Sequence, residues 1–211
     1  MGPRDRRERA RQETREKILD AAREMFAAEG VEAVTMREIA KRIEYTPTAI
    51  YHHFRDKQAL IQELVETDFL AFSQAFQKTG RIADPVARLR AAGLAYVEFG
   101  LTHPSHYRVL FMTPELAATK ETVLDRRAHP GETAYDFLRR TVAEGIAAGR
   151  YRSELKDPEL VSQMMWASVH GLVSLHIVRV GGDAIPWRDA RKTARALVDN
   201  AMRGALREES E

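Results

Sequence analysis

Histidine offers the widest chemistry in this chain, which has seven histidines and no cysteine. His103 and His106 lie three residues apart in the string HPSH, a spacing compatible with a shared metal ion. With no carboxylate or cysteine adjoining that string, a surface or helix-capping role is favoured. His52 and His53 are neighbours, and neighbouring side chains on a helix point about 100° apart. They therefore do not form a metal pair, and we predict no metal site and no cofactor.

Catalytic chemistry is not indicated by the remaining residues. The absence of cysteine excludes disulfide scaffolds, thiolate zinc sites and cysteine nucleophiles. No nucleophile, base and orienting group occur as a recognisable set. We predict that the chain is not an enzyme; the alternative is an enzyme with a metal at His103 and His106, which the absence of stoichiometric metal would exclude.

Helices must position whatever site the chain has, because apolar residues recur at helical spacing and no stretch shows strand-like alternation. All the prolines except Pro3 lie where a helix can begin, since proline at the first helical position sacrifices no hydrogen bond. The predicted fold class is all-α. Helices are expected over residues 14–29, from 36 to a turn at 44–45, and over 47–53, 56–78, 84–102, 104–112, 114–148 with a break near His129, 158–180 and 186–207.

The opening residues and the most apolar stretch of the chain indicate where in the cell the protein works. Residues 160–180 are interrupted by Gln163, His170, His176 and Arg179, so they read as a buried helix rather than a membrane span. No apolar signal core follows the opening basic residues, and a cytoplasmic protein is predicted. The first eleven residues hold five arginines against two acids. This basic arm is either a phosphate contact or a solvated terminus.

Two short helices stand out in the string TMREIAKRIEYTPTAIYHHF. Thr35 and Glu38 form a capping box that starts the first helix at Met36. Thr46 caps the second, which is too short to be stable unless it packs against its neighbours. A helix–turn–helix fits this pattern, because its second helix must be narrow enough to enter a major groove about 12 Å wide. Periodicity alone leaves a helical hairpin within a bundle equally open.

The longer string TMREIAKRIEYTPTAIYHHFRDKQAL resembles the DNA-binding domain of the TetR (tetracycline repressor-like) family of bacterial transcription regulators. The resemblance covers residues 14–64 and departs from the family at Glu44 and Thr48, where glycine is common. Glu44 indicates a turn without a positive φ angle. The residues that carry the match are Thr35, Ile39, Ala40, Tyr51, Phe54, Lys57 and Leu60.

The resemblance implies two kinds of DNA contact. Backbone phosphates are expected to meet Thr35, Thr46, Tyr51 and Lys57. Base edges are expected to meet Arg37, Pro47, Thr48, Ala49 and His52, with Arg37 as the best donor to guanine.

The resemblance also implies that the rest of the chain binds a ligand and forms a dimer. The string WASVHG, from Trp166 to Gly171, resembles the Trp-x-x-x-His-Gly signature of the WHG subclass, and a structural role is favoured for Trp166 and His170. Aromatic candidates for an apolar ligand pocket are Phe69, Phe72, Phe76, Tyr96, Phe99, Tyr107, Phe111 and Tyr135. Candidates for the dimer interface are Met165, Trp166, Val169, His170, Leu172, Trp187, Ala194, Leu197, Val198 and Ala201.

These expectations combine into one predicted architecture. A flexible basic arm (1–13) precedes a three-helix helix–turn–helix domain (14–56), which the fourth helix joins to a regulatory and dimerisation domain (57–211). The implied function is a homodimeric repressor that binds a palindromic operator and is released by a small molecule. The alternative is a helical protein–protein adaptor that keeps the fold without binding DNA.

Overall fold

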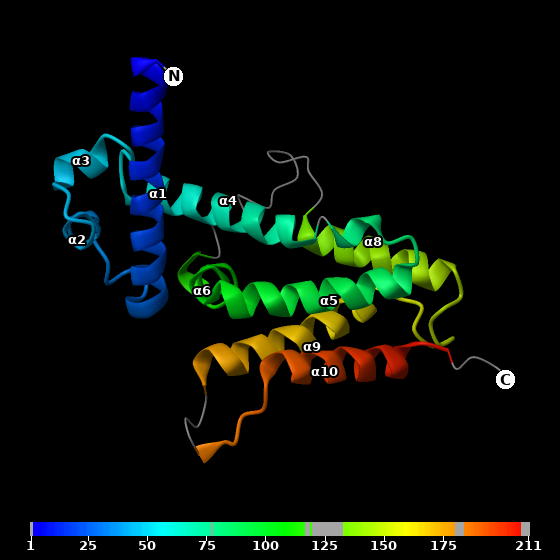
Figure 1. Ribbon diagram of the computed structural model, residues 1–211. Helices are drawn as coiled ribbons and strands as arrows, with labels where there is room; N and C mark the ends of the chain where they lie inside the picture. Colours follow the sequence, from blue (N-terminus) through cyan, green and yellow to red (C-terminus); the bar gives the residue numbers. More distant parts are fainter. Residues whose placement is uncertain (1, 77, 117–118, 120–132, 180–183, 208–211) are drawn as a thin grey trace. The chain divides into compact units, whose positions relative to one another are not determined.

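The computed structural model describes residues 2–76, 78–116, 119, 133–179 and 184–207. In these residues the regular elements are helices (Figure 1). Apart from them there is one isolated β-bridge, between Tyr151 and Leu206. The all-α prediction is therefore confirmed. The chain divides into two compact units: unit 1 is Met1–Leu70 with Ser105–Pro130, and unit 2 is Ala71–Pro104 with Gly131–Glu211.

Unit 1 is built on three N-terminal helices, α1 (Pro3–Glu29), α2 (Met36–Arg42) and α3 (Pro47–Tyr51), and on the first part of α4 (Lys57–Phe76). The later segments α6 (Pro104–Phe111) and η2 (Pro114–Leu116) add Val109 and Leu116 to the same hydrophobic core. That core is completely shielded from solvent at its centre, where Ile18, Ile39, Ile50, Leu60, Leu64 and Val65 meet. The helix pair α2–α3 is thus held by burial rather than by its own length.

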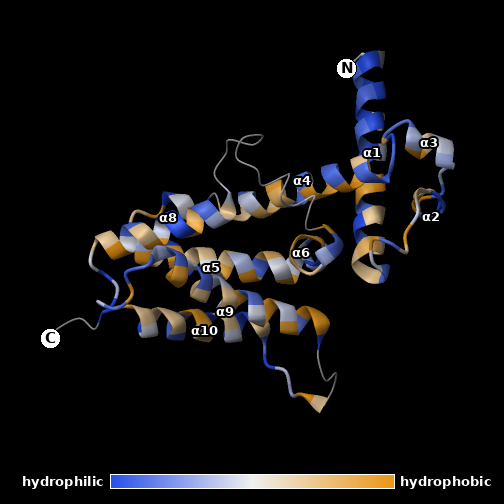
Figure 2. Ribbon diagram, turned by 180° about the vertical axis from the view of Figure 1, so that it is seen from behind, coloured by the Kyte–Doolittle hydropathy of each residue, from blue (hydrophilic) through white to orange (hydrophobic). Residues whose placement is uncertain are grey.

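Helix α1 begins at Pro3, so the start predicted at Thr14 is wrong. Pro3 occupies the first turn, where its missing N–H costs nothing, and the Asp5 carboxylate accepts a hydrogen bond from the Gly2 amide at 2.9 Å. Residues 4–13 carry no buried stripe, which is why apolar periodicity did not detect this part of the helix. In Figure 2 these turns are hydrophilic, and apolar residues enter only further along α1.

Unit 2 contains the end of α4, η1 (Thr79–Arg81), α5 (Pro85–Thr102), α8 (Ala134–Ala147), α9 (Pro158–Val178) and α10 (Ala190–Ala205). Helix α5 packs against α8, α9 and α10. Gly93 allows the close approach, because a Cβ there would lie 3.4 Å from Val198 on α10 and 3.7 Å from Val169 on α9. The bridge at Tyr151 is flanked by hydrogen bonds from Arg152 N to Ala205 O and from Arg207 N to Arg150 O, each 3.0 Å, and these fix the end of α10.

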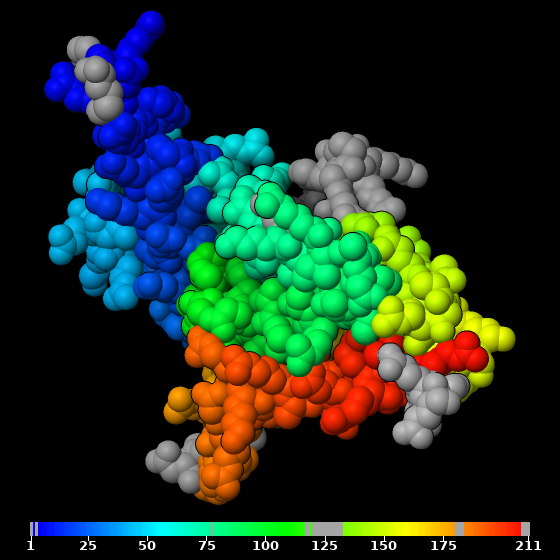
Figure 3. Space-filling model, turned by 45° about the vertical axis from the view of Figure 1, so that its right-hand side comes forward, coloured from blue at the N-terminus to red at the C-terminus, as the bar shows by residue number. Residues whose placement is uncertain are grey.

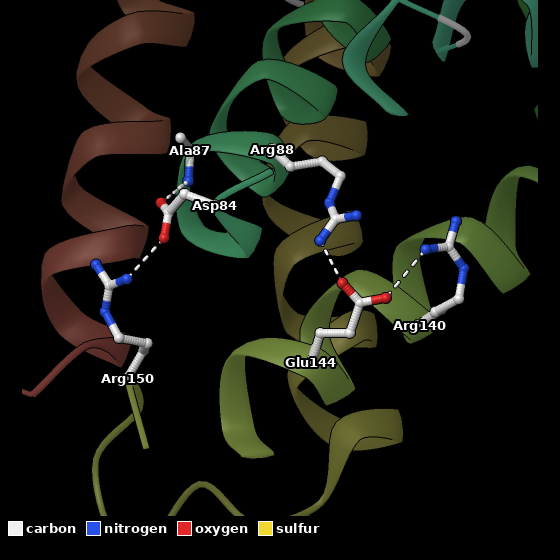
Figure 4. Close-up of polar contacts among 6 residues, drawn as sticks. All are labelled: Asp84, Ala87, Arg88, Arg140, Glu144 and Arg150. Atoms are coloured by element: carbon white, nitrogen blue, oxygen red, sulfur yellow. Dashed lines mark hydrogen bonds and ion pairs between the residues drawn. The ribbon is translucent and has the colours of Figure 1, made fainter. Parts of the chain in front are cut away.

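Ion pairs fasten the first turn of α5 within unit 2 (Figure 4). The Asp84 carboxylate caps α5 by accepting from the Ala87 amide at 2.8 Å and pairs with Arg150 at 2.6 Å. The buried Arg88 donates to Glu144 on α8, which also accepts from Arg140 at 3.0 Å. A cap and two cross-links thus hold one end of α5.

The prolines mark most of the helix starts but not all of them. Pro47, Pro85, Pro104 and Pro158 each begin an α-helix, whereas Pro114 begins a single 3₁₀ turn. The start predicted at Pro186 is wrong, because α10 begins at Ala190 and is capped by Asp189, whose side chain accepts from the Lys192 amide at 2.7 Å. Trp187 therefore precedes α10. The break predicted near His129 lies outside the described residues, and α8 begins after the capping box of Thr133 and Asp136.

Candidate nucleic-acid interface and C-terminal aromatic cluster

The two threonine caps of the helix pair form as expected. Thr35 Oγ1 accepts from the Glu38 amide at 3.3 Å, while the Glu38 carboxylate accepts from the Thr35 amide at 2.7 Å and from its hydroxyl at 2.8 Å. The pKa of Glu38 is lowered, chiefly by these hydrogen bonds from Thr35. Thr46 Oγ1 accepts from the Ala49 amide at 3.2 Å and starts α3. The Thr35 hydroxyl both accepts and donates in its cap, whereas the Thr46 hydroxyl only accepts, so its O–H hydrogen remains available to a phosphate oxygen.

The turn between α2 and α3 corrects one sequence-based expectation. Glu44 has φ 60°, so the turn does use a left-handed residue, although glycine is absent. The Tyr45 amide donates to Ala40 O at 2.9 Å and the Glu44 amide donates to Lys41 O at 3.2 Å. These bonds reach back over the last turn of α2 and satisfy its final carbonyls, and this geometry requires the positive φ whatever the residue.

The predicted base-reading residues share an open face. Arg37 on α2 is exposed, as are most of the predicted residues on α3 and its cap, while Ala49 is half-buried. Tyr51, a predicted phosphate contact, is 51% exposed although it follows the fully buried Ile50. The exposed members on and beside α3 are Thr46, Pro47, Thr48, Tyr51 and His52. A five-residue helix whose outer side is uncovered has the dimensions of a recognition helix.

Lys57 has a structural role in addition to its predicted phosphate contact. Its ammonium group donates to the Val31 carbonyl at 2.6 Å and lies 6.0 Å from the centre of the Phe26 ring. This ties the first residue of α4 to the segment that follows α1. A substitution of Lys57 would therefore disturb the fold of unit 1, whatever its effect on the predicted phosphate contact.

Arg15 fixes α1 against the end of α3. Its guanidinium lies 4.3 Å from the centre of the Phe54 ring, donates to the His53 carbonyl at 2.8 Å and forms a bidentate pair with Glu63 on α4. The bidentate geometry sets the orientation of the guanidinium. Three helices of unit 1 thus meet at one side chain.

Unit 2 contains an aromatic cluster on α4, α5 and α8. Phe72 packs edge-to-face with Phe76, Tyr96 and Phe99, with ring centres 4.9, 5.5 and 5.2 Å apart, and Phe76 lies 6.2 Å from Phe137. All five side chains are buried. The structure therefore brings together four of the predicted pocket residues: Phe72, Phe76, Tyr96 and Phe99.

A polar chain joins this cluster to α9. Trp166 Nε1 donates to the Tyr96 hydroxyl oxygen at 3.0 Å, and that hydroxyl lies 3.1 Å from His170 Nδ1. Burial lowers the pKa of His170, which favours the neutral ring. The Tyr96 hydrogen is then available for Nδ1, and Nε2 lies 3.2 Å from Ser174 Oγ. The structural role predicted for the Trp166–His170 pair is thus a hydrogen-bonded one.

The other pocket candidates lie elsewhere. Phe69 packs against the core of unit 1, and the buried Tyr107 pairs with Phe111 in the same unit at 4.9 Å. Tyr135 on α8 lies 5.8 Å from Trp166 and donates to Glu159. Membership of a ligand site stays a prediction for all of them.

Several predicted dimer contacts are used inside the chain. Val169, Leu172, Ala194 and Val198 are buried in unit 2 by α5, α9 and α10. The large apolar side chains that α9 leaves exposed are instead Leu160, Met164, Leu175 and Val178, each 45–50% exposed. Trp187 packs against His176, with ring centres 5.0 Å apart. Met165, Leu197 and Ala201 are partly exposed.

The two histidines of the HPSH string have different neighbours. His103 stacks on Phe99 at 5.0 Å, whereas His106 Nε2 lies 3.8 Å from the Asp68 carboxylate. Among the described residues, no three histidine, aspartate or glutamate side chains are grouped to hold a metal ion. No described helix is long and apolar enough to cross a membrane.

Both halves of the chain match known family models. Residues 18–64 match the model described as bacterial regulatory proteins, tetR family, and residues 89–202 match the tetracyclin repressor-like C-terminal domain, which spans more than half of the chain. The chain belongs to the TetR family. It is therefore a DNA-binding transcriptional regulator, and the resemblance noted over residues 14–64 is confirmed.

Individual TetR-family proteins match the chain over most of its length. The chain is 30% identical over 166 residues to the HTH-type transcriptional repressor KstR2 of Mycobacterium tuberculosis, covering 74% of this chain and 79% of that one. The solved structure of that ketosteroid transcriptional regulator has a TM-score of 0.72 at 22% identity, covering 92% of this chain and 96% of the other. The structure of FadR from Bacillus subtilis in complex with stearoyl-CoA has a TM-score of 0.70 at 18% identity, covering 89% and 97%.

Sequence reasoning missed the buried ion pair of unit 1 in this TetR-family protein. Arg23 on α1 donates to the Asp68 carboxylate on α4 at 2.9 Å, and it also pairs with the exposed Asp20 at 2.6 Å. Burial raises the pKa of Asp68, whereas the Arg23 hydrogen bonds and charge act to lower it. A signal existed: Arg23 lies four residues after Leu19 and three before Phe26, on the buried face of α1.

Proposed function

We propose that this regulator binds an inverted-repeat operator as a dimer and releases it when a mostly apolar small molecule binds unit 2. The observation that carries the proposal is the capped pair α2–α3, whose reading face is exposed while its inner face is locked into the unit 1 core. An operator-binding protein works beside the chromosome, so the bacterial cytoplasm is its expected location.

The reading face is tested by a selection of DNA from a random pool at two salt concentrations. We expect an enriched inverted repeat with half-sites one or more helical turns apart. Arg37→Ala should cost about 1–3 kcal/mol at particular base positions. The exposed Arg152 in unit 2 provides a charge-matched control, and Arg152→Ala should leave the selected sequence unchanged. Sequence-blind binding by the wild-type protein would contradict the proposal.

A dimer is supported by the exposed apolar row on α9, because single helices seldom leave four large apolar side chains in solvent along one face. This row replaces the buried residues first predicted for the interface. Met164→Glu should shift the protein towards monomer in sedimentation experiments. Gln163→Glu introduces the same charge at the neighbouring exposed position and should leave the dimer intact. Equal dissociation by both variants would argue against this row.

An apolar effector is supported by the aromatic cluster, which consists of packed rings joined to the polar chain at the Tyr96 hydroxyl. The names of two related structures point the same way, because one protein is called a ketosteroid transcriptional regulator and the other is in complex with stearoyl-CoA. The chain has two tryptophans, so Trp187→Phe leaves Trp166 as the only reporter. Trp187 Nε1 makes no hydrogen bond to any described residue, so this substitution removes none.

The titration uses stearoyl-CoA, with coenzyme A alone as the control for its polar part. Saturable change in Trp166 fluorescence with stearoyl-CoA, and none with coenzyme A, would support an acyl-binding site at the cluster. No response to either would leave the operator proposal standing and reject an acyl effector of this kind.

Release is proposed to act through α4, since this single helix contains residues of both units. A ligand that favours one conformation of the cluster around Phe72 would shift the population of α4 positions and so the separation of the two recognition helices in the dimer. Crystal structures with and without effector that show identical recognition-helix separations would reject this mechanism.

A further inference from the structure

The first turns of α1 lie outside the part of the chain that matches the family model, which begins at residue 18. These turns nevertheless form regular helix from Pro3 onward. All residues from Arg4 to Glu13 are exposed, and Figure 3 shows the first turns of α1 in deep blue standing clear of the light blue α2 and α3. Because this exposed helical extension covers no hydrophobic core, burial does not explain its composition.

The arginines of this extension are arranged in a row. Arg4, Arg7, Arg11 and Arg15 follow one another at spacings of three, four and four residues, so they share one face of α1. Arg6 and Arg9 point to the opposite face. In the described part of the chain no hydrogen bond or ion pair joins Arg4, Arg7 or Arg11 to another residue. Glu8 is the one acidic residue on this face between Arg4 and Arg11, so the three arginines leave the face with an excess of positive charge.

The row is fixed in place beside the recognition helix. Its last member, Arg15, donates to the carbonyl of His53, two residues beyond the end of α3, and is held there by Glu63 and Phe54. Arg11, one turn earlier, is near enough that its charge contributes to lowering the pKa of His53, after the larger effect of burial. The arginine face therefore lies on the side of unit 1 where α3 ends.

The spacing suits the backbone of DNA. At about 1.5 Å per residue, the row from Arg4 to Arg15 spans about 16 Å. A DNA strand carries one phosphate per about 3.4 Å of helix axis, so several phosphates lie within that span. We propose that the Arg4–Arg7–Arg11 face is a second DNA-binding surface, which contacts the phosphate backbone flanking each half-site. This inference rests on the DNA binding of α2–α3 and adds a contact by residues that precede the part of the chain matching the family model.

The face is tested with two double variants of the full-length protein. Arg7→Gln with Arg11→Gln removes two charges from the row, and Arg6→Gln with Arg9→Gln removes two from the opposite face of the same turns. Glutamine has nearly the helix propensity of arginine, so both variants should keep α1, as circular dichroism will verify. Binding is measured on the selected operator and on random duplex DNA over a range of salt concentrations.

The row variant should bind both DNAs about tenfold more weakly and lower the slope of log K against log salt by about 1.8, or 0.9 for each lost phosphate contact. The opposite-face variant should match the wild type. The wild type should also lose affinity when the duplex is trimmed to the half-sites, and the row variant should not. Equal effects of the two variants, or no dependence on flanking DNA, would overturn the proposal.

Two further outcomes separate this inference from the proposed function. If the wild type binds an operator through Arg37 and the row variant binds it equally well, the second surface is rejected while the operator proposal stands. If the wild type binds no duplex, both fail. Loss of binding by the row variant to vesicles of phosphatidylglycerol and phosphatidylcholine, with DNA binding unchanged, would assign the arginine face to a membrane surface and overturn the DNA proposal.

Discussion

The two compact units bury polar groups in different ways. Unit 1 buries an ion pair, with Asp68 fully buried and Arg23 only 4% exposed, whereas unit 2 buries a neutral chain around the Tyr96 hydroxyl. An ion pair in a core cannot change partners without leaving a charge unpaired. A neutral hydroxyl can exchange one hydrogen bond for another at modest cost. The difference suits a rigid reading unit and a sensing unit that must rearrange.

The largest effect is expected from the ion pair of unit 1. Asp68→Leu leaves the buried Arg23 with only the exposed Asp20 as a partner and should lower the free energy of unfolding by about 3 kcal/mol. Arg23→Leu should cost a similar amount because it removes the guanidinium from the buried Asp68 and leaves His106, whose Nε2 lies 3.8 Å from the carboxylate, as the more distant partner. The measurement is urea unfolding followed by circular dichroism.

The double variant Arg23→Leu with Asp68→Leu sharpens this result. Removing both charges should recover most of the lost stability, because no buried charge remains. Both tryptophans lie in unit 2, so their fluorescence reports on that unit alone. Additive losses in the double variant would mean that packing, rather than charge pairing, explains the single substitutions.

A smaller effect is expected from the neutral chain of unit 2. Tyr96→Phe leaves Trp166 Nε1 and His170 Nδ1 without the hydroxyl and should lower the free energy of unfolding by about 1–2 kcal/mol. Tryptophan fluorescence during urea unfolding measures it. Affinity for the operator should not change in the absence of effector, because the reading face of unit 1 is untouched.

Tyr151 provides the matched control in the same unit. It is only 4% exposed, and burial raises its pKa to about 12, yet its hydroxyl makes no hydrogen bond to any described residue. Tyr151→Phe should therefore be nearly neutral. Equal destabilisation by the two substitutions would show that the Tyr96 hydrogen bonds contribute nothing specific.

The pH dependence of stability separates the units further. Burial lowers the pKa of His170, so below about pH 6.5 the unfolded chain binds a proton that the folded chain does not. Stability should therefore fall as the pH drops through 6.5 towards the folded pKa. His53 in unit 1 acts in the same direction through burial and the charges of Arg11 and Arg15.

Substitutions assign this loss to its source. Unfolding free energies measured from pH 8 to pH 5 should decline less steeply in His170→Gln when followed by tryptophan fluorescence, which reports on unit 2. His53→Gln should flatten the decline seen by circular dichroism instead. An unchanged slope in both variants would attribute the decline to other groups.

The fold was predictable where local signals decide the structure. Thr35 and Thr46 predicted two helix caps, and Pro47 and Pro85 predicted two helix starts. These residues act on the backbone within a few positions of themselves, so the sequence suffices. The helical start of α1 was missed, since exposed arginines give no apolar period. The role predicted for Lys57 was incomplete, because its hydrogen bond to the carbonyl of Val31 depends on tertiary packing. The burial of Val198 against Gly93 likewise depends on tertiary packing.

The candidate site was predictable in its reading half and less so in its sensing half. The exposed face of α3 followed from the spacing of Ile50 and Phe54, which must both point inward. Trp166 and His170 converge on Tyr96, from which they are 70 and 74 positions away in the sequence. A sequence pattern on one helix carries no information about the hydroxyl that a distant helix supplies.

The smallest effect is expected at the turn between α2 and α3. Glu44 holds φ 60°, a conformation that costs a residue with a Cβ about 1 kcal/mol. Glu44→Gly should therefore raise the free energy of unfolding by about 0.5 kcal/mol, since glycine also has more freedom to lose from the unfolded chain. Glu44→Ala keeps the Cβ and should give no gain. If circular dichroism melts show both variants equally stabilised, the benefit comes from removing the carboxylate beside the DNA-reading face, and the backbone at this turn is not strained.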